Sequence, residues 1–152
     1  MSTEFNGKKL LVIGGTSGMG LQTARMVLEQ GGSVVIVGHR EDKAEEARKA
    51  LSSLGTVTAL TADLSRAEDV KRLLHTIDEH HKDINLLVNA AGVFFPKAFL
   101  EHTESDYEQY LTLNKAFFFI TQKVVANLVA SERPGAIVNV GSMWGKQAIG
   151  AT

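Results

Sequence analysis

Cysteine is absent from the sequence, which excludes disulfide bonds and thiolate metal sites. A charge imbalance is absent too, since 16 basic and 17 acidic residues give a formal net charge of -1. No basic stripe or cluster favours binding to nucleic acid or to a membrane surface. Apolar runs such as 117–120 are far too short to cross a bilayer, and residues 1–4 lack the basic and apolar regions of a signal peptide. These absences predict a soluble, cytoplasmic, globular protein.

A glycine-rich turn follows the first apolar run of the sequence. Residues 10–13 are apolar and lead into Gly14-x-x-x-Gly18-x-Gly20, which opens a helical pattern. A turn without Cβ atoms lets backbone N–H groups approach a pyrophosphate, and the helix points its positive end at the same anion. The spacing differs from the commonest dinucleotide-binding fingerprint, so an ordinary tight turn remains an alternative. The predicted apolar face of the helix consists of Met19, Ala24, Val27 and Leu28.

Predicted strands and helices alternate along the rest of the chain. We expect strands at 33–38, 57–60, 84–88 and 136–140, helices at 41–54 and 103–130, and a loop at 93–102. Ser65-x-x-Glu68 is the pattern of a capping box and predicts the start of a further helix. The apolar residues of that helix are Val70, Leu73, Leu74 and Ile77.

This alternation indicates an α/β fold, a parallel sheet with helices on both faces. Right-handed crossovers then predict a Rossmann-like, doubly wound sheet of strand order 3-2-1-4-5, truncated after the fifth strand, with residues 1–152 as a single domain. Ligands of such sheets bind beyond the carboxyl ends of the strands, near the reversal between the first and fourth. The residues that follow predicted strand ends are the glycine turn, Arg40, Asp63, Asn89 and Ser142. Their convergence favours a binding site over an ordinary turn.

The residues after the second predicted strand bear on the choice between NAD and NADP. An acid about 20 residues beyond the glycines holds the 2′-hydroxyl of NAD, but this sequence has Gly38-His39-Arg40 there. A guanidinium binds a 2′-phosphate through charge-assisted hydrogen bonds. The sequence therefore favours NADP(H) over NAD(H). The alternative is a surface arginine that pairs with Glu41 or Asp42.

Two glycine-containing motifs resemble those of the short-chain dehydrogenase/reductase family. Residues 13–20 resemble its T-G-x-x-x-G-x-G motif, with Ile13 in place of the threonine. Residues 89–92, Asn-Ala-Ala-Gly, resemble its N-N-A-G motif, with Ala90 in place of the second asparagine.

Three further matches occur in the same order as in that family. Asp63-Leu64 is similar to the pair that lines the adenine pocket, and Asn114 matches an active-site asparagine inside a long helix. Residues 138–142 resemble the strand that ends in the catalytic serine, here Ser142. The five matches cover essentially the whole chain, and together they are more specific than any one alone.

The resemblance implies two groups of site residues. In the catalytic group, Ser142 orients the substrate carbonyl, and Asn114 holds a helix bend and a water of the proton relay. The expected cofactor-binding residues are Gly14, Thr16, Ser17, Gly18, Met19, Gly20, His39, Arg40, Asp63, Leu64, Asn89, Ala90 and Gly92.

Several of these residues also have a plainer interpretation. Asp63 is suited to capping the helix expected at Ser65, and Asn89 to strand-end turn chemistry. Ser142, taken alone, is a loop serine. Asn114 has apolar neighbours, where an amide needs hydrogen-bonding partners, and a helix-bending role accounts for it better than chance.

Other side chains of chemical interest carry less information. His75, His80 and His81 lie at a polar helix end without organised carboxylate partners, so we interpret them as solvated and expect no metal site. Three aromatic residues either line a substrate cleft or pack the loops: Phe94, Phe95 and Trp144.

The largest departure from the family is the absence of its Tyr-x-x-x-Lys pair. The tyrosines of the chain are Tyr107 and Tyr110, and the residues four positions later are Leu111 and Asn114. In the family mechanism the tyrosine exchanges a proton with the substrate oxygen, while the lysine and the cofactor lower its phenol pKa from about 10. The resemblance therefore implies an NADP(H)-dependent oxidoreductase of small carbonyl/alcohol substrates whose present 152 residues are inactive alone. The alternative is a non-catalytic dinucleotide-binding or sensor module.

Two surfaces predict a homo-oligomer. The helix at 111–130 is apolar nearly all round, and a helix of that kind is buried on more than one side. One face holds Leu113, Phe117, Ile120, Val124 and Leu128, and the other apolar residues are Phe118, Phe119, Val125 and Val129. The predicted strand 136–140 has an open edge that recruits another strand. Family members commonly pair this helix with its copy, so we expect assembly through the helix, the strand, or both.

Overall fold

Five strands and four α-helices alternate along residues 3–142, the part of the chain that the computed structural model describes. The one additional element is a short 3-10 turn, η1 (Phe99–Glu101), within the loop expected at 93–102. In chain order the strands and helices are β1 (Lys9–Ile13), α1 (Gly18–Glu29), β2 (Ser33–Gly38), α2 (Glu41–Leu51), β3 (Val57–Thr61), α3 (Ala67–His80), β4 (Leu86–Asn89), α4 (Glu104–Ala130) and β5 (Ala136–Asn139).

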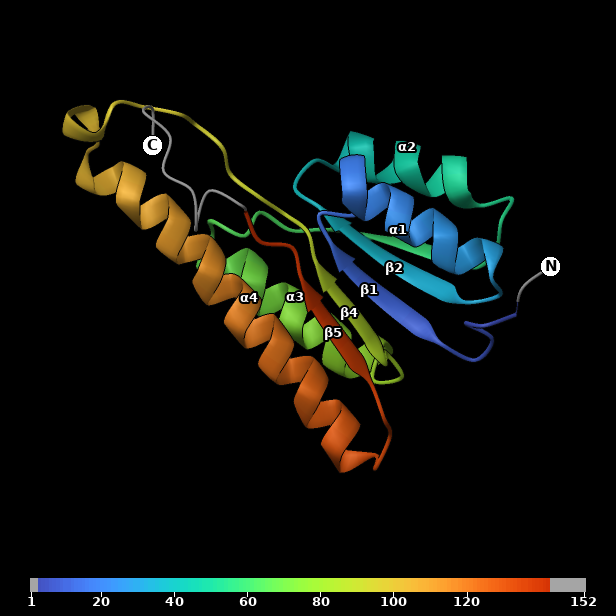
Figure 1. Ribbon diagram of the computed structural model, residues 1–152. Coiled ribbons are helices and arrows are strands. Elements are labelled where there is room, and N and C mark those ends of the chain that lie inside the picture. The colour runs from blue at the N-terminus through green and yellow to red at the C-terminus, as the bar shows by residue number, and fades with distance from the viewer. Residues whose placement is uncertain (1–2, 143–152) are drawn as a thin grey trace.

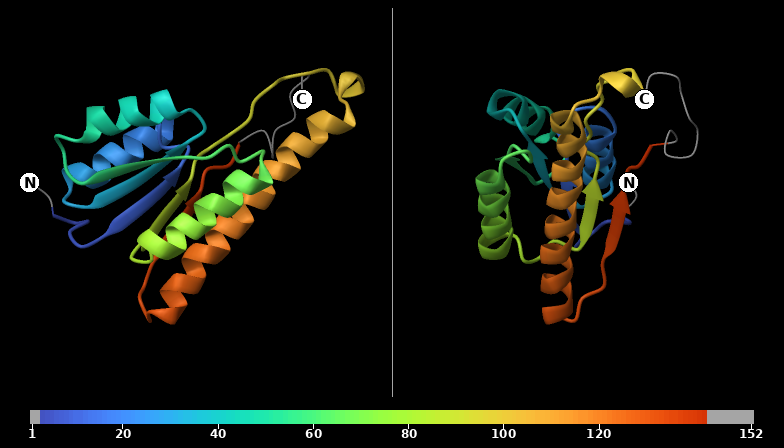
Figure 2. Two further views of the ribbon diagram at one scale, coloured as in Figure 1. Left: turned by 180° about the vertical axis from the view of Figure 1, so that it is seen from behind. Right: turned by 90° about the vertical axis from the view of Figure 1, so that its left-hand side faces the viewer.

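The strands form one parallel sheet of order β3-β2-β1-β4-β5, which confirms the predicted α/β topology. Helices α1 and α2 cover one face, and α3 and α4 lie on the other (Figure 1; Figure 2). Ile13 lies opposite Val37 of β2 and Asn89 of β4, so three strands end at the same edge of the sheet. Their carboxyl ends are therefore brought together, as the crossovers require.

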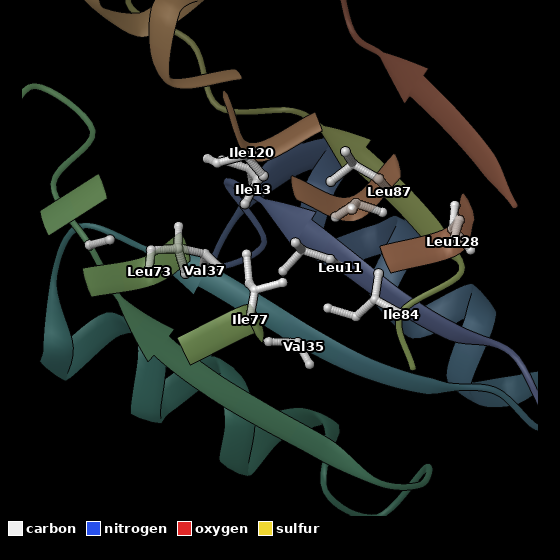
Figure 3. Packing of buried hydrophobic residues seen from close by; sticks show 12 residues of the cluster. Leu11, Ile13, Val35, Val37, Leu73, Ile77, Ile84, Leu87, Ile120 and Leu128 are labelled. Carbon is white, nitrogen blue, oxygen red and sulfur yellow. The ribbon is translucent and has the colours of Figure 1, made fainter. Parts of the chain in front are cut away.

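Two buried clusters hold the helices on the sheet, because successive side chains of a strand point to opposite faces. On β1, Leu11 and Ile13 pack toward α3 and α4 (Figure 3), and Leu10 packs toward α1 and α2. All three side chains are at most 1% exposed. A strand buried on both faces reads as a continuous apolar run, which is the pattern at 10–13 and 33–38.

Two expectations for the helices are wrong. Met19 does not share the apolar face of α1 and is 67% exposed, because five residues at 100° each carry it about 140° around the helix from Ala24. Helix α2 ends at Leu51 instead of 54, and the N–H of Leu54 donates to the Leu51 carbonyl (2.9 Å) in a closing turn.

The capping box expected at Ser65 is also absent. Helix α3 begins two residues later, and the Ser65 N–H and hydroxyl both donate to Oδ1 of Asp63 (2.9 and 2.6 Å). Since the serine hydroxyl is engaged with a side chain before the helix, it does not cap the first turn. A capping box does occur at α4, where Thr103 and Asp106 exchange hydrogen bonds.

Helix α4 has the predicted extent and a mixed surface. Its buried residues are Ala116, Ile120, Val124 and Leu128, and the last three pack onto α3 and the sheet. Other apolar residues stay accessible, with Phe118 63% and Val129 72% exposed. Within residues 3–142, none of the helices combines the length and apolar character that a bilayer crossing needs.

Candidate functional site

A cavity of about 610 Å³ lies at the carboxyl ends of β1, β2 and β4. Its wall is made by the glycine turn, by the ends of the second and third strands, by the turn after β4 and by two side chains of α4. The lining residues include Gly14, Thr16, Ser17, Gly18, Met19, Gly20, His39, Asp63, Leu64, Ala90, Gly92, Gln109 and Leu113. The cavity is therefore at the strand reversal, where doubly wound sheets bind ligands.

The glycine turn is shaped by a close approach of two main-chain segments. Gly14 has a φ of +83°, and a Cβ atom there would lie 2.5 Å from the backbone nitrogen of Ala91. Gly20 faces the carbonyl of Gly14 with no room for a Cβ atom. Only glycine fits at both positions, so the turn after β1 packs directly on the turn after β4.

The N-terminus of α1 opens into the same cavity. Ser17 is the N-cap residue, and its side chain makes no capping hydrogen bond to the first turn. The first N–H groups of a helix have no acceptor inside the helix and carry its positive dipole end. This arrangement suits an anion the size of a phosphate.

The two residues that follow β2 differ in their contacts. His39 lines the cavity, whereas Arg40 precedes α2 and binds Asp42 through both nitrogens of one edge, with Nε to Oδ1 at 3.1 Å and Nη2 to Oδ2 at 2.6 Å. The hydrogen bond from Arg40 lowers the pKa of Asp42. The pairing that the sequence left as an alternative is thus present.

Asp63 lies on the cavity wall with its carboxylate oriented by the turn that follows it. Its Oδ1 accepts two hydrogen bonds from Ser65, and these bonds lower the pKa of Asp63. Its own N–H donates to Oδ2 of Asp69 (3.0 Å) on α3. Asp63 therefore stabilises the turn that precedes α3 and does not cap the helix itself.

Asn89 is fully buried and does not line the cavity, although Ala90 and Gly92 do. Its Nδ2 donates to Oγ1 of Thr121 on α4 (3.2 Å) and to Oδ1 of Asn139 on β5 (2.8 Å). The amide thus ties β4 to its neighbours on two sides. Its predicted part in cofactor binding remains a prediction.

The expected catalytic residues lie outside the cavity wall. Asn114 is exposed on α4, so its amide is not enclosed by apolar neighbours, and Ser142 is exposed beyond β5. Helix α4 instead reaches the cavity through Gln109 and Leu113, which the sequence reading missed. Their spacing of four residues places them on one face, but only the packing of α4 shows that this face meets the cavity.

The aromatic residues of the 93–102 loop contribute little to the cavity. The ring of Phe95 packs on Tyr110 with centroids 4.9 Å apart, and Phe94 is 62% exposed. Trp144 lies outside the described residues.

The interpretation of three solvated histidines is wrong for His81, which is 9% exposed. The chain turns into the sheet directly after α3, and the His81 N–H donates to the Ile77 carbonyl (3.0 Å). Burial, followed by the positive charge of Lys9, lowers the pKa of His81. His75 and His80 are exposed as expected. Across residues 3–142, no three His, Asp or Glu side chains gather as metal ligands.

Known proteins share both the sequence pattern and the fold. The chain is 30% identical over 147 residues to 3-oxoacyl-(acyl-carrier-protein) reductase of Chlamydia pneumoniae, with 96% of this chain and 59% of the relative covered. It is 28% identical to the NADP-dependent (R)-specific alcohol dehydrogenase of Lentilactobacillus kefiri, over 95% of this chain and 58% of the relative. The chain thus spans less than two thirds of these curated relatives.

A solved structure shows the same likeness, and a family model extends it along the chain. A short chain dehydrogenase from Mycobacterium smegmatis superposes with a TM-score of 0.89 at 27% identity, covering 99% of this chain and 64% of that one. The model described as short chain dehydrogenase matches residues 8–152. With the glycine turn, the strand order and the cavity in the positions described above, the chain belongs to the short-chain dehydrogenase family.

Proposed function

We propose that residues 1–152 are the dinucleotide-binding domain of an NADP(H)-dependent oxidoreductase, without the C-terminal part of the family fold. The reaction is hydride transfer between the nicotinamide and a small carbonyl/alcohol substrate. The observation that carries this proposal is the cavity at the strand reversal, which is lined both by the glycine turn that leads into α1 and by the turn after β4. When bound, the cofactor supplies or accepts the hydride.

In this proposal, different residues around the cavity bind different parts of the cofactor. The first-turn N–H groups of α1 and the glycine turn hold the pyrophosphate, since they present donors and a positive dipole to one anion. Asp63 and Leu64 line the same cavity and, in this proposal, contact the adenine. Arg40 holds the 2′-phosphate by charge-assisted hydrogen bonds, and the turn at 90–92 supports the nicotinamide half.

Catalysis by these 152 residues is incomplete in this proposal. Ser142 orients the substrate carbonyl, and Asn114 holds a water of the proton relay. No Tyr-x-x-x-Lys sequence occurs to exchange the proton. The second candidate is a dinucleotide-binding or sensor module without chemistry of its own, which would use the same cavity.

Cofactor titration tests the binding proposal. Arg40→Ala is expected to weaken NADPH binding by a free energy of about 1.5–3 kcal/mol, because a charged hydrogen-bonding partner is lost. NADH, which has no 2′-phosphate, is expected to bind both forms alike. Arg48→Ala on α2 is the matched control, since that arginine pairs with Glu45 and is not proposed to contact the 2′-phosphate. Equal affinity of the unmodified chain for the two cofactors would remove the basis for NADP(H).

Turnover tests the incomplete chemistry. We expect no steady-state reduction of a general carbonyl substrate by the pure chain with NADPH. Turnover that is lost on Ser142→Ala would contradict the proposal of an inactive chain. Cofactor binding without any turnover leaves the choice between enzyme part and module to the encoded sequence after Thr152.

We also propose that the chain forms a two-fold dimer through α4. An outer stripe of α4, at steps of three or four residues, consists of Tyr107, Leu111, Asn114, Phe118, Gln122, Val125 and Val129, all of them exposed. In an antiparallel pair centred on Phe118, the residues equally distant from the centre meet. Leu111 then contacts Val125 of the other copy, and Asn114 meets Gln122. Every apolar position of the stripe thus meets an apolar one, and an amide meets an amide, which suits an isologous interface.

Sedimentation at micromolar concentration tests this dimer. Phe118→Lys is expected to give a monomer, because it places two cations at the centre of the interface. Ala130→Lys adds the same charge at an exposed position of α4 outside the stripe and is expected to leave the dimer intact. A stable monomer of the unmodified chain, with no mass change on dilution, would contradict the proposal. The open edge of β5 is the alternative contact, and dimers that survive Phe118→Lys would favour it.

A further inference from the structure

We infer that Asp42 lowers the preference of the chain for NADP(H) by holding the Arg40 guanidinium that binds the 2′-phosphate. The inference rests on the proposed function, since it concerns the same binding site. It makes Asp42 a specificity-determining residue that does not itself touch the cofactor.

The carboxylate of Asp42 occupies one hydrogen-bonding edge of the Arg40 guanidinium. Arg40 uses Nε and Nη2 at once, in contacts of 3.1 and 2.6 Å to the two oxygens of Asp42. This edge of the guanidinium is one of its two bidentate faces for carboxylate or phosphate. A 2′-phosphate must therefore either displace Asp42 or accept the remaining edge beside a carboxylate of like charge.

The pair is weak enough to be displaced. The side chains of Arg40 and Asp42 are 57% and 63% exposed. Exposed ion pairs of this kind contribute little free energy, because water and salt screen them and two side chains lose freedom. Displacement of Asp42 by a phosphate therefore costs little but is not free, and the cost falls only on the phosphorylated cofactor.

The charged groups around the pair do not replace Asp42. Glu46 lies close enough to act on Arg40 electrostatically but is bound to Lys43 (2.7 Å). Glu41, the nearest acid in the sequence, forms neither a hydrogen bond nor an ion pair with Arg40 within residues 3–142. Asp42 is thus the carboxylate in direct contact with the guanidinium.

The test compares Asp42→Asn with Glu41→Gln. Each change removes one negative charge from the first turn of α2, so both lose a similar interaction with the helix dipole. Only Asp42→Asn frees the guanidinium. NADPH and NADH are titrated against both variants, together with adenosine 2′,5′-bisphosphate and adenosine 5′-phosphate, which differ in the 2′-phosphate alone.

We expect Asp42→Asn to tighten binding of NADPH and of the bisphosphate about two- to fivefold, the range that an exposed ion pair permits. The affinities for NADH and adenosine 5′-phosphate are expected to be unchanged, because these ligands have a 2′-hydroxyl and no 2′-phosphate for the guanidinium to bind. In the Arg40→Ala background the gain is expected to vanish, since no guanidinium remains to be freed.

Three outcomes overturn the inference. Weaker NADPH binding by Asp42→Asn means that Asp42 positions Arg40 for the phosphate, and an equal gain in Glu41→Gln means a general charge effect. A gain that persists without Arg40 means that the pair is irrelevant. In all three cases the proposed function stands, because NADPH still binds. Failure of the unmodified chain to bind any of the four ligands instead overturns the proposed function together with the inference.

Discussion

Strands β4 and β5 are neighbours with the same register but opposite surroundings. Leu87 lies opposite Ile137 and Val88 opposite Val138. Leu87 and Val88 are 1% and 9% exposed, whereas Ile137 and Val138 are 37% and 53% exposed. Among the described residues, β4 pairs with both β1 and β5, whereas β5 pairs with β4 alone. The two strands therefore differ both in backbone pairing and in the packing of side chains on the faces of the sheet.

The covered part of the sheet and its exposed edge have different consequences. Buried side chains of β1, β2 and β4 contact helices on both faces and hold the cavity edge in place. All four residues of β5 are exposed, and so are the residues of the outer stripe of α4. The covered strands are thus expected to supply most of the stability of the fold, and the exposed surfaces of β5 and α4 are expected to mediate self-association.

The largest expected effect tests that division of stability. Leu11→Ala, in the middle of β1, removes a side chain that is 0% exposed and leaves a cavity. It is expected to lower the free energy of unfolding by about 2–5 kcal/mol. Ile137→Ala on β5 is the matched change, and as a surface substitution it is expected to cost about 0.5 kcal/mol or less. Urea denaturation of both variants measures the difference, and equal losses would contradict the comparison.

A second variant tests the junction between β1 and β4. Gly14→Ala is expected to cost about 2–4 kcal/mol, because a left-handed φ is unfavourable for alanine and the new Cβ atom overlaps the main chain of Ala91. Gly18 also has a positive φ, +52°, but open space around its Cβ position. Gly18→Ala is therefore the control for conformation alone and is expected to cost about 1–2 kcal/mol. If the two variants have the same denaturation midpoint, the close approach of residue 14 to the main chain of Ala91 does not contribute to the loss of stability.

Much of the fold was predictable because its signals are local. Continuous apolar runs at 10–13 and 33–38 gave buried strands, and helices between them required parallel pairing with right-handed crossovers. The glycine turn was predictable for the same reason, since φ and Cβ constraints act within a few residues. Strand order and the place of the cavity then followed from topology.

The surroundings of single side chains were not predictable in this way. The spacing of Ser65 and Glu68 predicts a helix cap, but the Ser65 hydroxyl donates its hydrogen bond to Asp63 instead. Gln109 and Leu113 reach the cavity only because α4 packs where it does. The burial of Asn89 could be predicted from the sequence, because it lies two positions after Leu87, which places both side chains on one face of β4.

The exposed edge of β5 was foreseen, but its contrast with β4 was not. Both strands are short apolar segments that end in asparagine, and neither sequence states how many helices cover it. Coverage depends on residues distant in the chain. The sequence alone therefore predicts strands better than it predicts their environment.

The smallest expected effect concerns His81, at the amino-terminal edge of the covered strands. Burial disfavours the charged imidazole and lowers the pKa of His81, and the charges of Lys9 and His80 act in the same direction, whereas Asp83 opposes them. The unfolded chain, with an ordinary pKa of about 6.5, binds this proton more readily than the folded one. The neutral His81 therefore makes its full contribution to stability above that pH. This contribution is lost as the pH falls through the pKa of His81 in the unfolded chain and then through its pKa in the folded chain.

His81→Asn removes this titration, and His75→Asn, at an exposed position of α3 that does not act on His81, is the control. Urea denaturation at several pH values from about 7.5 to 5.5 measures the slope around the ordinary histidine pKa. The unmodified chain and His75→Asn are expected to lose stability alike as the pH falls, and His81→Asn is expected to lose less. The effect is small because Asp83 compensates part of the positive charge and the Lys9 contact with Asp83 (2.8 Å) persists throughout this range. If the free energy of unfolding of His81→Asn has the same pH dependence as that of the unmodified chain, the imidazole is protonated as easily in the folded chain as in the unfolded one. The surroundings of His81 would then be no more shielded from water than β5.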